Sequence, residues 1–122
     1  MPTDHDTSID MLKLQVQNFC EARDWDRYHN AKDLAIGISV ETAELLEQFR
    51  YKTNNEIEGL FLTEENRDKI THEVADIFFL LLRFSQVYDI DLATELSKKM
   101  ELNEKKYPVA KAKGSNKKYT EF

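Results

Sequence analysis

The stretch from Thr63 to Tyr88 limits the possible folds more than any other part of this chain. Its apolar residues recur every three to four positions, the spacing that places side chains on one face of an α-helix. The members of this stripe are Ile70, Val74, Ile77, Leu81 and Phe84. Thr63 is suited to cap such a helix, and two acidic residues follow it at the positive end of the helix dipole. We therefore predict one long helix from Thr63 to Tyr88.

Three further segments show the same spacing and have polar residues suited to begin a helix. Their expected bounds are Thr7 or Ser8 to about Asp24, Asp33 to about Lys52, and Asp89 or Asp91 to Pro108. Proline ends the last segment because it lacks the backbone N–H that a helix interior needs. The stretch 54–62, which contains Gly59, is expected to be an excursion between two helices.

The composition supports a helical fold, because the chain has only 3 glycines and 2 prolines. A length of 122 residues predicts one domain. Four amphipathic helices bury their apolar faces as a bundle, so we predict an all-α, four-helix-bundle-type domain over residues 1–108. Residues 109–122 contain four lysines and are expected to form a basic, loosely structured tail.

The long helix is apolar around much of its circumference near Phe78, Phe79 and Leu82. A helix with one solvent-exposed side normally carries polar residues on that side, not apolar ones. This helix therefore either occupies the centre of the bundle or also contacts another subunit. On this ground we expect a homo-oligomer.

Charge and cysteine content exclude several classes of protein. The net charge of −6 argues against a surface that binds nucleic acid polymers. The single Cys20 has no partner for an intrachain disulfide, as expected in a reducing cytoplasm. The polar, acidic N-terminus does not resemble a signal peptide. Since the longest apolar run covers only 77–82, no membrane span is expected, and we predict a cytoplasmic protein.

Two pairs of acidic residues lie within apolar helical runs: Glu41 with Glu44, and Glu73 with Asp76. Residues three apart share one face of a helix, so each pair projects together. Their neighbours are apolar, which places the acids on or beside the buried face. Burying unpaired carboxylates is costly, so a cation is expected to compensate them. Clustered oxygen ligands without histidine favour a hard ion such as Mg²⁺.

The two acid pairs also have explanations other than Mg²⁺ binding. A single E-x-x-E motif on a helix is common and usually forms a solvated face. A di-iron site normally pairs a glutamate with a histidine three residues later, whereas His72 directly precedes Glu73 and points about 100° away. The Asp89-x-Asp91 pair is no calcium loop, because the sixth position lacks glycine.

Several other side chains are candidates for contacting a ligand. Trp25 and Tyr28 flank an inter-helix connection and could stack on a base, although a core or boundary aromatic is the commoner case. His29 lies in the same connection, where a surface position is the default. Phe19, Phe49 and Tyr51 are expected in the core or in a pocket wall. Each of these aromatic residues therefore has two open interpretations.

Asn103 falls on the apolar stripe of the last predicted helix, one turn before Tyr107. A polar residue there needs a partner, so it is either a satisfied core amide or a ligand contact. The tail lysines at 111, 113, 117 and 118 are either solubilising charges or a cover for an anionic ligand.

The order of these residues resembles the MazG-like all-α nucleoside triphosphate pyrophosphohydrolases, and within them the dCTP pyrophosphatase branch. The E-x-x-E…E-x-x-D signature corresponds to Glu41-Thr-Ala-Glu44 and, after 28 intervening residues, Glu73-Val-Ala-Asp76. The dCTP branch is also similar at Ala22-Arg-Asp-Trp-Asp-Arg-Tyr-His29, at Lys99 to Val109 and at Gly114 to Thr120. The similarity covers nearly the whole chain.

This resemblance implies an oligomeric four-helix-type fold, usually a dimer or tetramer. It implies Mg²⁺, with Mn²⁺ as a substitute, held by Glu41, Glu44, Glu73 and Asp76. Trp25 matches a base-stacking aromatic residue, Asn103 a polar residue of the nucleotide pocket, and Lys118 a phosphate contact. With the neighbouring pocket residues, the expected substrate contacts are Phe19, Trp25, Tyr51, Asn103, Tyr107 and Lys118.

The sequence also departs from the family pattern. Thr42 and Ala43 replace the Val-Gly commonly found between the first two acids, and Tyr51 stands where the dCTP branch has Trp. Val16 and Leu80 occupy positions that are polar or aromatic in that branch. These differences concern the base pocket rather than the four acids.

The function we predict is Mg²⁺-dependent hydrolysis of a (deoxy)nucleoside triphosphate, such as dCTP or a modified pyrimidine nucleotide, to the monophosphate and pyrophosphate. Such an enzyme removes unwanted nucleotides, and one glutamate of the cluster activates the attacking water. The alternative is a non-enzymatic helical binding module in which the acids are structural or face a partner.

Overall fold

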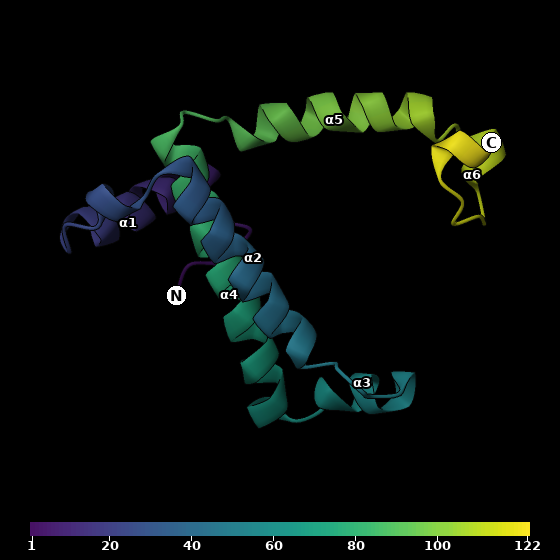
Figure 1. Cartoon of the computed structure of the whole chain (residues 1–122), viewed down its shortest axis with the longest axis horizontal. Helices are drawn as coiled ribbons and strands as arrows, with labels where there is room; N and C mark the ends of the chain where they lie inside the picture. Colours follow the sequence, from purple (N-terminus) through teal and green to yellow (C-terminus); the bar gives the residue numbers. More distant parts are fainter. The chain divides into compact units, whose positions relative to one another are not determined.

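A computed structural model describes all residues, 1–122, and contains helices but no strands. The α-helices, shown in Figure 1, are α1 (Ile9–Glu21), α2 (Ala31–Glu47), α3 (Asn54–Leu60), α4 (Glu64–Val87), α5 (Leu92–Lys106) and α6 (Val109–Ala112). Two 3₁₀ turns are also present, η1 (Asp26–Tyr28) and η2 (Tyr119–Glu121). The predicted all-α class is confirmed.

Polar side chains begin the helices close to the predicted places. The Ser8 hydroxyl accepts a hydrogen bond from the Met11 N–H at the start of α1, and Asp91 accepts one from the Thr94 N–H at the start of α5. Each of these bonds satisfies a backbone donor that the helix itself leaves unpaired. The long helix begins after Thr63, as expected, although the Thr63 side chain makes no capping bond.

The second helix begins and ends earlier than predicted. Asn30, not Asp33, is its cap, because the Asn30 side chain accepts a hydrogen bond from the Asp33 N–H at 2.9 Å. The helix ends at Glu47 rather than near Lys52. Tyr51 has a φ of 61°, in the left-handed region, which a continuing right-handed helix does not allow.

Most of the excursion predicted at 54–62 forms the short helix α3. Thr53 and Glu56 make a capping box, in which each side chain binds the other residue's backbone N–H. This motif was visible in the sequence as Thr-x-x-Glu. A stacked contact, with ring centroids 6.4 Å apart, joins Phe49, after the end of α2, to Phe61, directly after α3.

The chain divides into two compact units, Met1–Asp89 and Ile90–Phe122. In the first unit, α4 packs along α2 and against α1 (Figure 1). The helices α2 and α4 run antiparallel. A β-carbon at Gly37 would lie 3.1 Å from a methyl group of Leu80, so the absence of a side chain at Gly37 leaves room for the Leu80 side chain to pack against α2.

The core of the first unit is small for its apolar content. Its buried apolar side chains are Val16, Cys20, Leu34, Ile70 and Leu82. The predicted stripe on the long helix is therefore only partly buried: Ile70 is inside, but Val74 and Leu81 are exposed. The reason is that α4 turns a second face, which includes Leu82, towards its neighbours, and leaves part of the predicted stripe uncovered in the single chain.

The second unit consists of α5, α6 and η2. Its last residues are folded, which corrects the expectation of a loose tail. The ring of Tyr107 makes T-shaped contacts with the rings of Tyr119 and Phe122, with centroids 6.0 Å apart in both pairs. These aromatic contacts hold the end of the chain against the end of α5. In neither unit does a helix have the length and apolar content needed to cross a membrane.

Candidate metal centre

Three of the four predicted acids meet where α2 passes α4. One carboxylate oxygen from each of Glu41, Glu73 and Asp76 lies within 4.8 Å of the other two. The fourth, Glu44, is one turn further along α2, and its negative charge raises the pKa of both Glu41 and Glu73. The spacing of three residues on each helix thus brings the predicted set together at one place.

Two oxygens at the centre of this cluster are buried and have no hydrogen-bond partner: Oε2 of Glu41 and Oε2 of Glu73. Glu41 and Glu73 are half-buried as whole residues, whereas Glu44 and Asp76 are exposed. The cluster is therefore closed on the side of the helix pair and open to solvent on the other. Buried acceptors without a donor are rare, because each forfeits its bonds to water.

The electrostatics of the cluster are unfavourable without a cation. Burial, followed by the neighbouring carboxylate of Glu44, raises the pKa of Glu41 to about 7. The pKa of Glu73 is also raised, first by burial and then by Glu44. A divalent cation would reverse both effects, since it attracts the charged forms and satisfies the unpaired oxygens. The donor set, carboxylate oxygens only, fits Mg²⁺ or Mn²⁺.

An aromatic row runs from the connection after α1 towards this cluster. The ring of Trp25 meets that of Phe19 edge-on at 5.8 Å, and Phe19 meets Phe79 edge-on at 5.7 Å. Phe79 follows Asp76 by three residues on α4, so the row ends within one helical turn of an acid. A cavity of about 320 Å³ lies along the row, and its lining residues are Leu12, Gln15, Val16, Phe19, Ala75, Phe78, Phe79 and Leu82.

The structure separates Tyr51 from the aromatic row within the single chain. Trp25 precedes α2 and Tyr51 follows it, so the length of that helix lies between them. Tyr51 is 90 % exposed, and Arg50 lies over its ring and donates a hydrogen bond to its hydroxyl at 2.9 Å. The role of Tyr51 in substrate binding stays a prediction.

The three other expected substrate contacts belong to the second unit. Asn103 is half-buried on α5, and its backbone carbonyl oxygen accepts a hydrogen bond from the backbone N–H of Tyr107 at 2.8 Å. Lys118 caps η2, and its backbone N–H donates to the Glu121 carboxylate at 3.1 Å. Three lysines, Lys105, Lys106 and Lys111, line a cavity of about 320 Å³ in this unit. The nucleotide contacts of Asn103, Tyr107 and Lys118 stay predictions.

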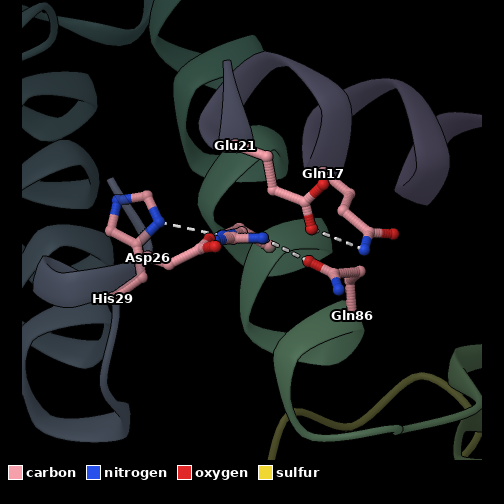
Figure 2. Close-up of polar contacts among 6 residues, drawn as sticks. Gln17, Glu21, Asp26, His29 and Gln86 are labelled. Carbon is pink, nitrogen blue, oxygen red and sulfur yellow. Dashed lines mark hydrogen bonds and ion pairs between the residues drawn. The ribbon is translucent and has the colours of Figure 1, made fainter. Parts of the chain in front are cut away.

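The sequence did not reveal the buried polar group around Arg83, whose partners Asp26, His29 and Gln86 are labelled in Figure 2. Arg83 is buried on α4 and binds His29, Asp26 and Gln86. His29, for which a surface position was the default, is half-buried for this reason. The missed signal was an arginine that directly follows the apolar run 77–82 and precedes Phe84 on the long helix, since a buried charge needs partners.

The fold and the site together define an all-α protein with a cluster of carboxylates, suited to hold a cation, on two antiparallel helices. The chain belongs to the MazG-like family, whose family model matches residues 36–122. The matched range contains all four acids, and the predicted family is confirmed.

Curated relatives and a solved structure agree with this assignment. Human dCTP pyrophosphatase 1 is 30 % identical over 116 residues, which cover 95 % of this chain and 68 % of the relative. The mouse dCTP pyrophosphatase 1 is 29 % identical over the same coverage. A pyrophosphatase from Archaeoglobus fulgidus has 33 % sequence identity and a TM-score of 0.77, covering 88 % of this chain and 99 % of its own. The predicted enzyme class, nucleotide pyrophosphohydrolase, is confirmed.

Proposed function

We propose that this enzyme hydrolyses a (deoxy)nucleoside triphosphate between its α- and β-phosphates in a Mg²⁺-dependent reaction. One water is consumed, and the products are the nucleoside monophosphate and pyrophosphate. The observation that carries the proposal is the pair of buried, unpartnered oxygens on Glu41 of α2 and Glu73 of α4, which form one cluster with Asp76. Such oxygens are suited to bind a cation, and the family and its pyrophosphatase relatives supply the reaction.

The acids have two tasks in this proposal. Glu41, Glu44, Glu73 and Asp76 hold Mg²⁺, or Mn²⁺ in its place, through their carboxylate oxygens. When bound, the ion supplies positive charge that neutralises and orients the phosphate chain and makes a water more acidic. One glutamate of the cluster accepts the proton of the attacking water.

The aromatic row is the proposed place for the base. A base that stacks on Trp25 or Phe19 would lie along a row that ends one turn from Asp76, where the phosphates would meet the cation. Base–aromatic stacking is worth about 1–3 kcal/mol per base. A pyrimidine such as that of dCTP is the proposed preference, supported by the dCTP pyrophosphatases among the relatives. Removal of unwanted nucleotides from the cellular pool is the proposed role.

A homo-oligomer is part of the proposal, because the single chain leaves large apolar side chains uncovered beside the acids. Val40, directly before Glu41, is 50 % exposed, and Val74, directly after Glu73, is 51 % exposed. Clustered exposure of this kind marks an interface. We expect sedimentation velocity to show a particle of at least twice the 14.4 kDa chain mass. A particle of one chain mass at all concentrations would contradict this prediction.

Rates across a panel of substrates test the proposed function. Equal concentrations of canonical and modified deoxynucleoside and nucleoside triphosphates are incubated with the purified protein and Mg²⁺. We expect a pyrimidine deoxynucleotide to be consumed fastest and EDTA to stop consumption of all of them. If no triphosphate is consumed by folded, metal-loaded protein, the four acids are a structural cluster in a binding module.

A further inference from the structure

Arg83 is buried to a degree that is unusual for an arginine. Only 2 % of its side chain is exposed, although it lies on a helix between leucines and phenylalanines. A buried guanidinium is tolerated when its donors are satisfied, and here they are directed to side chains rather than to water. The guanidinium of Arg83 is therefore already occupied by His29, Asp26 and Gln86.

The partners of Arg83 lie mainly in one short segment. Its Nε donates to Nδ1 of His29 at 2.9 Å, and a terminal nitrogen forms an ion pair with Asp26 (Figure 2). The third partner, Gln86, is on α4 itself. His29 and Asp26 belong to the turn η1 or to its end, so two of the three contacts connect α4 to this turn.

The protonation state of His29 is consistent with its hydrogen bond from Arg83. A ring nitrogen that accepts a hydrogen bond carries no proton, so His29 is neutral with its proton on the other nitrogen. Burial lowers the pKa of His29, and the positive charge of Arg83 lowers it further. The guanidinium charge is balanced instead by Asp26, which is the only carboxylate bound to it.

Trp25 is the residue directly before η1, and its position depends on the turn. Its backbone carbonyl accepts the N–H of Tyr28 at 2.9 Å, and its ring meets that of His29 at 6.1 Å. The preceding residue, Asp24, has a φ of 55°, the left-handed conformation that commonly ends a helix, and the Trp25 N–H donates to the Cys20 carbonyl at 3.1 Å. The backbone on the α1 side of Trp25 is thus fixed by α1, and the turn on its other side is fixed by the contacts of Asp26 and His29 with Arg83.

We propose that Arg83 is a positioning residue for the nucleotide site: by fixing η1 to α4 it holds Trp25 against Phe19, the first contact of the aromatic row. This inference rests on the proposed function, in which Trp25 receives the base. Arg83 itself contacts neither the acid cluster nor the cavity along the row. Loss of its contacts is thus expected to weaken substrate binding and to spare the chemical step.

The chain offers a direct reporter and a matched control. Trp25 is the only tryptophan, so intrinsic fluorescence reports on this position alone. Arg27 lies in the same turn and pairs with Asp24, but both side chains are mostly exposed and neither forms an ion pair with a residue of α4. Arg83→Met removes the connection from α4, and Asp26→Asn weakens it from the exposed side with less risk to folding. Arg27→Met removes the same charge as Arg83→Met without breaking the connection.

The test combines acrylamide quenching of Trp25 in nucleotide-free protein with steady-state kinetics on the preferred triphosphate. For Arg83→Met and Asp26→Asn we expect stronger quenching, a KM raised about five- to twentyfold, and a kcat within about twofold of the wild type. Arg27→Met should match the wild type in both measurements. A melting curve for each variant establishes that it is folded.

The outcomes separate this inference from the proposed function. If wild-type protein hydrolyses nucleotides but Asp26→Asn and Arg83→Met leave quenching and KM unchanged, Arg83 only stabilises the fold and the inference is wrong. An equal loss of kcat with unchanged KM in both variants would also overturn it. If wild-type protein hydrolyses no nucleotide, the proposed function fails, whereas the quenching result still shows whether Arg83 holds Trp25. Should Arg83→Met not fold, Asp26→Asn decides the matter alone.

Discussion

Replacing Glu41 by glutamine is expected to abolish nucleotide hydrolysis while the protein stays folded. The amide has the size of the carboxylate but no charge, so it holds a divalent cation poorly. Loss of one charged ligand is expected to reduce kcat/KM by at least about 100-fold. Asp76→Asn should have a similar effect, because Asp76 completes the set of three oxygens within 4.8 Å of one another. Initial rates at saturating Mg²⁺ measure the loss.

A second measurement distinguishes loss of the cation from loss of the fold. In metal-free protein, Glu41→Gln removes a negative charge from a group of four acids and adds a donor that can reach the neighbouring carboxylates. The variant should therefore melt at or above the wild-type temperature in EDTA. Glu47→Gln is the matched control, because Glu47 lies on α2 but is exposed and pairs with Arg50. Near-normal hydrolysis by Glu41→Gln or Asp76→Asn would contradict the proposed centre.

The second large effect is a dependence of stability on pH that Mg²⁺ removes. The pKa of Glu41 is about 7 in the folded protein, above its ordinary value of 4.5, and that of Glu73 is raised as well. A group whose pKa is raised by folding favours the folded state while it is protonated. Its contribution is complete below about pH 4.5 and disappears as the pH rises through about 7. Metal-free protein should thus lose stability between about pH 5 and pH 8.

Added Mg²⁺ should cancel this loss, because it binds the ionised carboxylates of the folded state only. The stabilisation by Mg²⁺ is consequently expected to be small near pH 5 and to grow towards pH 8. Each kcal/mol of difference should appear as about 4–8 °C in melting temperature for a domain of this size. Melting curves at several pH values in Mg²⁺ and in EDTA measure the effect. If Mg²⁺ stabilises equally at all pH values, the acids of the cluster are not its ligands.

The helices were predictable because their information is local. The apolar spacing of the long helix, the Ser8 cap and the Asp91 cap depend on residues a few positions apart, and the structure has them where expected. The start of the second helix was misplaced because two nearby residues, Asn30 and Asp33, are both suited to cap a helix. Asn30 precedes Asp33 by three residues and takes its N–H, so the helix starts there.

The acid cluster was also predictable, for a reason that applies to few sites. Each pair lies three residues apart on one helix, so only the pairing of two helices had to be guessed. The sequence did not show that two oxygens would be both buried and unpartnered. That property depends on how α2 packs against α4, which brings together residues far apart in the sequence.

Arg83 and its partners could not be assigned from the sequence. His29 and Asp26 are separated from Arg83 by 54 and 57 positions. A buried arginine indicates that it has polar partners. The sequence does not identify them, because the chain contains many acids and other polar side chains. Only the packing of η1 on α4 shows which of them are used.

Identification of the reaction products tests the central claim most directly. The preferred triphosphate is incubated with wild-type protein and Mg²⁺, and the nucleotide and phosphate products are resolved by chromatography, with Glu41→Gln as the control. We predict nucleoside monophosphate and pyrophosphate in equal amounts from the wild type and neither product from the variant. Nucleoside diphosphate with inorganic phosphate, or products that Glu41→Gln forms equally well, would contradict the account.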